Sequence, residues 1–156
     1  MSEALTTESA TITLPSPKVE VDSNLQLLLN HLADEGFRPK IDDDGSLSFK
    51  CEGWKLYLDP YPNQGGFRLY CCVYWELDPI DRTKALGVAN EINADRRCVK
   101  AVVNGNNTVW VTYETHCADV VEYARTVASA ADFVVSGCRE YREAFRRESQ
   151  PVTLNA

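Results

Sequence analysis

The apolar residues at the start of the chain adopt a helical period only after residue 22. Residues 1–21 are rich in Ser, Thr and Glu, contain two prolines and show no sustained period, so we expect a disordered or loosely attached arm. Beyond it, leucines recur at the i, i+3, i+4 and i+7 spacing, which predicts a helix over residues 24–35 with one apolar face. These leucines are Leu25, Leu28, Leu29 and Leu32.

From residue 37 onward the apolar period shortens to two, which is typical of β-strands. Asp44-Gly45 is a hairpin signal, and Gly53 separates the two runs that follow it. Residues 60–66 hold two prolines and two glycines, so we expect a loop there. Strands are predicted over residues 38–41, 46–51, 54–59 and 67–77.

The rest of the chain predicts two helices around a second hairpin. Asp78-Pro79 is typical of a helix start, with an N-cap acceptor followed by proline in the first turn. Residues 104–107 read Asn-Gly-Asn-Asn, a strong turn signal, so strands are expected over residues 98–103 and 108–115. Apolar residues spaced by three and four from Val120 onward then predict one long helix of about 30 residues.

The predicted order of elements is αββββαββα, which indicates an α+β domain with an antiparallel sheet and segregated helices. We place this single domain over residues 22–147 and expect a tail over residues 148–156. Gly137 lies inside the long final helix, where it is expected to weaken the helix and to allow a bend.

Composition and charge narrow the function classes. The chain has 156 residues, of which 44% are hydrophobic and 25% charged, values typical of a globular domain. It carries 16 basic and 23 acidic residues, for a formal net charge of −7. This excess of negative charge disfavours bulk attraction to nucleic acid or to an anionic membrane, so we expect neither as a partner.

The first residues show no basic segment followed by an apolar one, and no run of about 18 apolar residues occurs, so we expect a cytoplasmic protein. In that compartment the six cysteines are expected to be small apolar side chains and not a disulfide framework. No recognised catalytic or metal-ligand spacing is present, so we expect no catalytic residues, no metal and no cofactor. One alternative is a thiol-dependent redox or metal-handling protein that uses Cys117 with His116, or Cys71 with Cys72.

Strand alternation points to a candidate binding surface. If Phe67 and Trp75 face the core, the residues between them alternate to the opposite face of the sheet. Aromatic side chains with polar groups are enriched at protein interfaces. The candidate partner-binding residues are therefore Tyr57, Arg68, Tyr70, Tyr74 and Trp110. Two other interpretations remain open: strands favour aromatic residues in any case, or the final helix covers this face.

The order of these elements, together with Asn90 and Asn93 in the second helix, resembles the YbjN family. The resemblance covers about residues 22–147, and its most specific part is the asparagine pair in Ala89-Asn90-Glu91-Ile92-Asn93. Proteins of this family are described as bacterial sensory transduction regulators and are similar in fold to type III secretion chaperones. The resemblance implies a non-enzymatic domain whose chaperone relatives dimerise and hold client segments.

Composition, pattern and resemblance together predict a protein-binding module, acting as a regulator or chaperone-like adaptor in bacterial signalling or stress response. Its expected partner is a protein client or a second copy of the chain. The asparagines themselves are expected to cap the helix end or to bond a neighbouring strand.

Overall fold

The computed structural model describes residues 23–61 and 66–148, and within them the chain forms one six-stranded antiparallel sheet with helices packed on it. The elements are α1 (Ser23–Asp34), β1 (Lys40–Ile41), β2 (Leu47–Cys51), β3 (Trp54–Tyr61), β4 (Gly66–Tyr74), η1 (Pro79–Asp81), α2 (Arg82–Asp95), β5 (Val99–Val103), β6 (Val109–His116) and α3 (Val120–Glu148). This confirms the predicted α+β class and element order. The predicted arm and all but the first residue of the predicted tail lie outside the described residues.

The sheet has the strand order β1-β2-β3-β4-β6-β5, and each neighbouring pair is antiparallel. Two tight turns build its first half. Glu52 and Gly53 both have positive φ, 47° and 83°, which gives a two-residue turn between the paired Cys51 and Trp54. Gly45, with φ 82°, closes the loop between β1 and β2, as the Asp44-Gly45 signal predicts.

The predicted loop over residues 60–66 begins too early. Pro60 and Tyr61 still belong to β3 and pair with Phe67 and Gly66 of β4. Proline is tolerated here because the pairing of β3 with β2 ends at Leu58, so this part of β3 has a strand on one side only.

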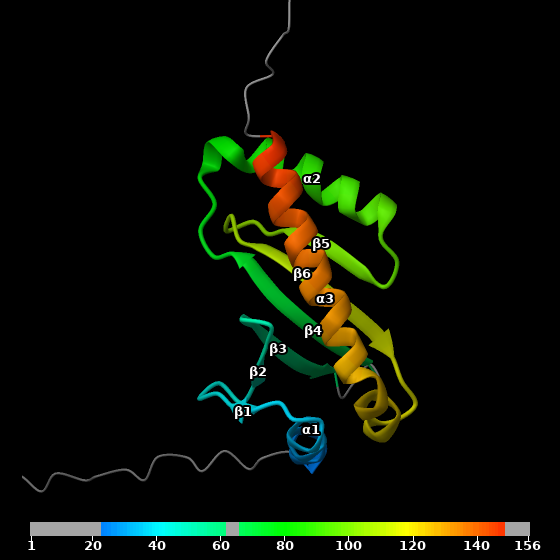
Figure 1. Cartoon of the computed structure of the whole chain (residues 1–156). Coiled ribbons are helices and arrows are strands. Elements are labelled where there is room, and N and C mark those ends of the chain that lie inside the picture. Colours follow the sequence, from blue (N-terminus) through cyan, green and yellow to red (C-terminus); the bar gives the residue numbers. More distant parts are fainter. Residues whose placement is uncertain (1–22, 62–65, 149–156) are drawn as a thin grey trace, which may run out of the picture.

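The helix α3 lies across one face of the sheet, with α1 near its N-terminal end and α2 near its C-terminal end (Figure 1). The Tyr123 ring of α3 stacks on Phe67 of β4, with centroids 4.3 Å apart. A Cβ atom on Gly137 would lie 3.0 Å from the Val111 side chain of β6. Gly137 therefore allows the middle of the helix to approach the sheet closely, a role that the sequence pattern alone did not indicate.

The helix α2 covers β5, the strand at one edge of the sheet. The Asn93 side chain accepts a hydrogen bond from the Ala101 N–H at 2.7 Å and donates one to the Ala101 carbonyl at 3.1 Å. Arg96, just after α2, forms a two-pronged ion pair with Glu140 of α3 and donates to Ser136 at 2.8 Å. These contacts tie α2 both to the sheet edge and to the long helix, which protects an otherwise unpaired strand.

Candidate functional site

Three aromatic rings form a continuous stack across the face of the sheet that lies opposite α3. Tyr57 of β3 is the register partner of Tyr70 of β4, and their rings stack with centroids 5.3 Å apart. Tyr70 in turn stacks on Trp110 of β6 at 4.9 Å. The stack thus joins three adjacent strands. Such contacts between side chains on neighbouring strands stabilise an antiparallel sheet.

One ion pair completes this surface. The Arg68 guanidinium lies 5.0 Å from the Tyr70 ring centroid and 5.6 Å from that of Trp110, within the range of cation–π attraction. Its NH2 group donates to the Asp59 carboxylate at 2.5 Å, which holds the guanidinium over the rings. Burial raises the pKa of the Tyr70 hydroxyl to about 12, so this ring stays neutral near pH 7.

The alternation of side chains between the two faces of the sheet shifts by one residue at the C-terminal end of β4. The predicted faces of Tyr74 and Trp75 are therefore wrong. The pairing of β4 with β6 shifts register between Cys72 and Tyr74, as in a β-bulge. Tyr74 therefore faces α3 and packs against Phe145, with ring centroids 5.2 Å apart. Trp75, predicted to face the core, is 63% exposed and meets the edge of the Tyr57 ring at 6.1 Å.

The structure thus brings together four of the five predicted residues and replaces Tyr74 by Trp75. The interpretation in which the final helix covers this face is wrong, because the sheet residues that α3 contacts, Phe67 and Val111, are on the other side. We call the surface formed by the following residues the open face. They are Tyr57, Arg68, Tyr70, Trp75 and Trp110.

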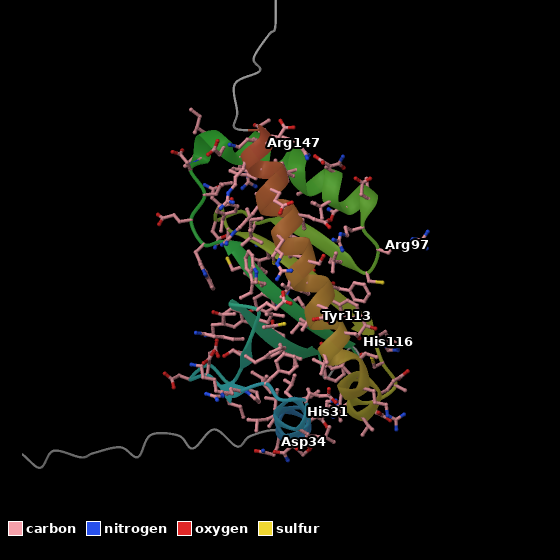
Figure 2. All side chains as sticks on the ribbon, viewed as in Figure 1. His31, Asp34, Arg97, Tyr113, His116 and Arg147 are labelled. Carbon is pink, nitrogen blue, oxygen red and sulfur yellow. The ribbon has the colours of Figure 1, made fainter. Side chains whose placement is uncertain are left out.

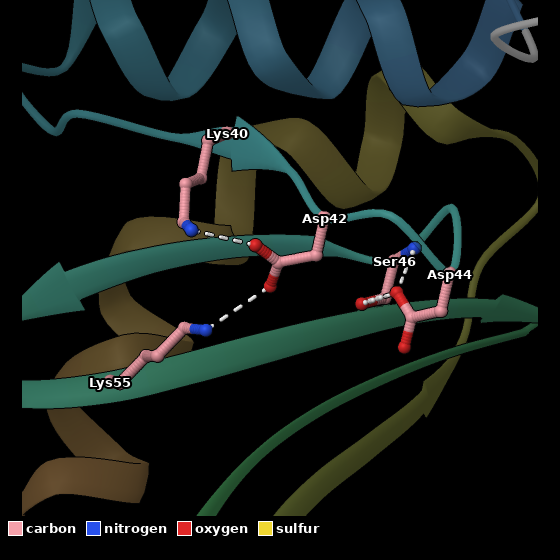
Figure 3. A network of polar contacts seen from close by, with 5 residues as sticks. All are labelled: Lys40, Asp42, Asp44, Ser46 and Lys55. Carbon is pink, nitrogen blue, oxygen red and sulfur yellow. Dashed lines mark hydrogen bonds and ion pairs between the residues drawn. The ribbon is translucent and has the colours of Figure 1, made fainter.

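Lys40, Asp42 and Lys55 form a charge cluster (Figure 3), which Lys55 connects to Tyr57 of the open face. The Asp42 carboxylate lies 2.8 Å from Lys40 Nζ and 3.1 Å from Lys55 Nζ, and the Lys55 ammonium lies 4.5 Å from the Tyr57 ring centroid. The hydrogen bond from Lys40, with a further contribution from Lys55, lowers the pKa of Asp42 from 3.8 to about 2. This cluster was not predicted, because its residues come from three different strands or turns.

The two thiol pairs of the alternative hypothesis are placed as follows. Cys71 and Cys72 are both buried neighbours on β4, and Cys72 pairs in register with Trp110 on β6. His116 lies exposed at the end of β6 (Figure 2), and Cys117 next to it is buried. Within residues 23–61 and 66–148, no group of three His, Cys, Asp or Glu side chains is close enough to hold a metal ion.

The two asparagines of α2 are both exposed and differ in their hydrogen bonds. Asn93 bonds the backbone of Ala101, so the expectation of a bond to a neighbouring strand is confirmed for this residue. Asn90, on the same helix, makes no such bond to the strand in the described structure.

Solved structures share this fold. The crystal structure of YbjN from E. coli, described as a putative transcription regulator, aligns with a TM-score of 0.60 at 16% identity, over 80% of this chain and 93% of that one. The HopA1-SchA chaperone-effector complex aligns with a TM-score of 0.56 at 14% identity, over 78% of this chain and 96% of that one. The Yersinia pestis type III secretion chaperone SycH, solved with a fragment of YscM2, aligns at 0.46 and 10% identity, over 73% of this chain and 98% of that one.

The molecule is therefore an α+β domain with a type III secretion chaperone-like fold. Residues 24–147 match the family YbjN, described as "Putative bacterial sensory transduction regulator", and the chain belongs to this family. No curated protein matches the sequence. None of the helices in the described part of the chain is long and apolar enough to cross a bilayer.

Proposed function

We propose that this chain is a non-enzymatic, cytoplasmic protein-binding module that acts as a regulator or chaperone-like adaptor. The open face is its contact surface. The observation that carries the proposal is the stack of Tyr57, Tyr70 and Trp110 across three strands, on the side of the sheet opposite α3.

The composition of this surface supports the proposal. Tyr, Trp and Arg are the residues most enriched among those that dominate binding energy at protein interfaces. Their rings are already fixed by mutual stacking and by Arg68, so little side-chain freedom is lost when a partner binds. Membership of the YbjN family and the likeness to a chaperone-effector complex agree with a role in binding proteins.

Affinity capture from the native lysate tests the proposal. The bait is the full tagged chain, compared with the double variant Tyr57→Asp and Tyr70→Asp, which places two charges inside the ring stack. Phe133→Asp is the matched control, because Phe133 is 44% exposed on the long helix. Circular dichroism melts of all three baits establish that each one folds.

We expect a partner that wild type and the Phe133 variant both recover and that the double variant loses. Recovery of untagged copies of the chain itself would identify the partner as a second copy, and light scattering would then give the stoichiometry. The same set of proteins from all three folded baits would contradict the proposal.

A further inference from the structure

A hollow of about 460 Å³ lies at one end of the sheet, where β3 begins. The paired residues of β3 and β4 end at Leu56 and Cys71, whereas β4 continues to Tyr74. The first two residues of β3, Trp54 and Lys55, are therefore not paired with β4, and the hollow is lined by them and by the end of β4. We call it the notch; the lining residues that matter here are Trp54, Lys55, Tyr57, Val73, Trp75 and Arg142.

Arg142 reaches the notch from α3. Its guanidinium lies 4.1 Å from the Trp54 ring centroid, and its NH2 group donates to the Val73 carbonyl at 3.3 Å. The side chain is half-buried, and no carboxylate in the described part of the chain forms an ion pair with it. A stacked guanidinium held in this way keeps donors available for a ligand oxygen, because Arg has five N–H groups.

The other charges around the notch leave it positive. Lys55 also lines it and shares the Asp42 carboxylate with Lys40. The acidic side chain at the rim, Glu52, is paired with Arg139. A positive hollow in a chain with a formal net charge of −7 is a local feature that attracts an anionic group to this point.

Aromatic rings form the walls. Trp54 lies under the guanidinium, and Tyr57 and the largely exposed Trp75 meet edge to face at 6.1 Å. Small-ligand sites commonly combine aromatic walls with a few polar groups that fix the orientation of a ligand, and the notch offers both. The planar Arg fork matches the two oxygens of a carboxylate.

We propose that the notch binds a carboxylate joined to an aromatic or other apolar group, with Arg142 on the carboxylate and the rings around the apolar part. The carboxylate belongs either to a free small molecule or to an acidic side chain of a protein segment, and the chemistry recognised is the same. Tyr57 and Trp75 line the notch and also belong to the open face, so an occupant of the notch touches the edge of that surface. The inference does not depend on the proposed function.

Nuclear magnetic resonance on the full chain tests it, because the chain has only three tryptophans. Two of them, Trp54 and Trp75, line the notch, whereas Trp110 does not and serves as the internal reference. The probes are phenylacetate and its neutral analogue phenylacetamide. We expect saturable shifts of the Trp54 and Trp75 indole N–H signals with phenylacetate, and binding at least about tenfold weaker with phenylacetamide.

The variant Arg142→Met keeps an unbranched stem over Trp54 and removes the charge. It should weaken phenylacetate binding at least about tenfold, as expected for loss of a charge-assisted hydrogen bond. Arg146→Met, exposed on the same helix, is the matched control and should bind like wild type. Arg142→Lys separates charge from fork geometry, and melts of all variants check folding.

A second arm identifies the source of the carboxylate. The blocked peptide acetyl-Phe-Glu-Phe-amide is compared with its Gln analogue: binding of the Glu peptide without phenylacetate binding assigns the notch to a protein segment. Binding of phenylacetate shows that a free carboxylate suffices. Absence of Trp54 and Trp75 shifts with both acids, equal shifts with the neutral analogues, or wild-type binding by Arg142→Met would overturn the inference. These outcomes are distinguished from the capture result by the Arg142 variants, because Arg142 lines the notch and is not part of the open face.

Discussion

The Asn93 side-chain amide pairs with both backbone polar groups of Ala101, accepting from its N–H at 2.7 Å and donating to its carbonyl at 3.1 Å. One side chain thus replaces the strand that would otherwise bond this edge of the sheet. We expect Asn93→Ala to lower the free energy of unfolding by about 1–3 kcal/mol, because it removes two part-buried hydrogen bonds to the backbone of the edge strand, each worth about 0.5–1.5 kcal/mol. Asn90→Ala is the control and should change it by less than about 0.5 kcal/mol. Urea denaturation measures both, and equal effects would refute the structural role of Asn93.

Two buried tyrosines should respond differently to removal of the hydroxyl. The Tyr141 hydroxyl donates to the Ala85 carbonyl at 2.8 Å, whereas the Tyr123 hydroxyl is buried with no hydrogen-bond partner among the described residues. Tyr141→Phe should destabilise the protein by about 1 kcal/mol, and Tyr123→Phe should be neutral or stabilising. Thermal melts of both variants decide this. A loss of stability in Tyr123→Phe equal to that in Tyr141→Phe would contradict it.

Substitution of a helix glycine by alanine should have different effects at Gly87 and at Gly137, because their surroundings differ. At Gly87 of α2 an added Cβ meets nothing within 4 Å, so Gly87→Ala should stabilise the protein by about 1 kcal/mol through helix propensity. At Gly137 the added Cβ would lie 3.0 Å from Val111, and this contact should cancel the gain or reverse it. The melting temperature of Gly137→Ala is therefore expected below that of Gly87→Ala. Equal increases would show that α3 can move away from the sheet freely.

The cluster around Asp42 should make the stability of the folded protein depend on pH. An acid whose pKa is lower in the folded than in the unfolded state stabilises the fold above its ordinary pKa of 3.8, and loses this contribution as the pH falls to about 2. Asp42→Asn should therefore lower the melting temperature at about pH 6 and have little effect near pH 2. Asp43→Asn, exposed in the same turn, is the control. A deficit in Asp42→Asn that is the same at both pH values would contradict this assignment.

Thiol reactivity tests the alternative hypothesis. Cys98 is exposed, whereas the other five cysteines are buried, and burial raises the pKa of Cys72 to about 11. A native titration with a disulfide reagent should find one fast thiol, which Cys98→Ser removes. A fast thiol that remains in Cys98→Ser would instead favour a thiol function at Cys71, Cys72 or Cys117.

Periodicity was sufficient to predict the helices and most of the open face. The apolar stripe of the long helix fixes which side it buries, and α3 covers Val120–Glu148 as expected. Alternation likewise placed Tyr57, Arg68, Tyr70 and Trp110 on one face, because side chains on regular strands alternate without reference to the rest of the fold.

The features that the sequence pattern missed or placed wrongly are those whose local geometry depends on distant parts of the chain. Pro60 is tolerated in β3 because β2 has already ended, a fact about another strand. Arg142 reaches the Val73 carbonyl from 69 positions further along the chain, so no local motif contains the notch. Gly137 is explained by its approach to Val111, and helix propensity alone describes it as a defect.

The register shift between Cys72 and Tyr74 gives β4 a change of phase near its end. Consecutive strand residues point to opposite faces in any case, and the shift decides which residue takes which face. The Tyr74 ring joins the interior under Phe145, and the Trp75 indole goes to the surface. Removing a single residue at this point would exchange the two rings and leave the composition almost unchanged. Which aromatic ring the strand offers to a partner, the Trp75 indole in place of the Tyr74 phenol, is thus set by one residue of strand length.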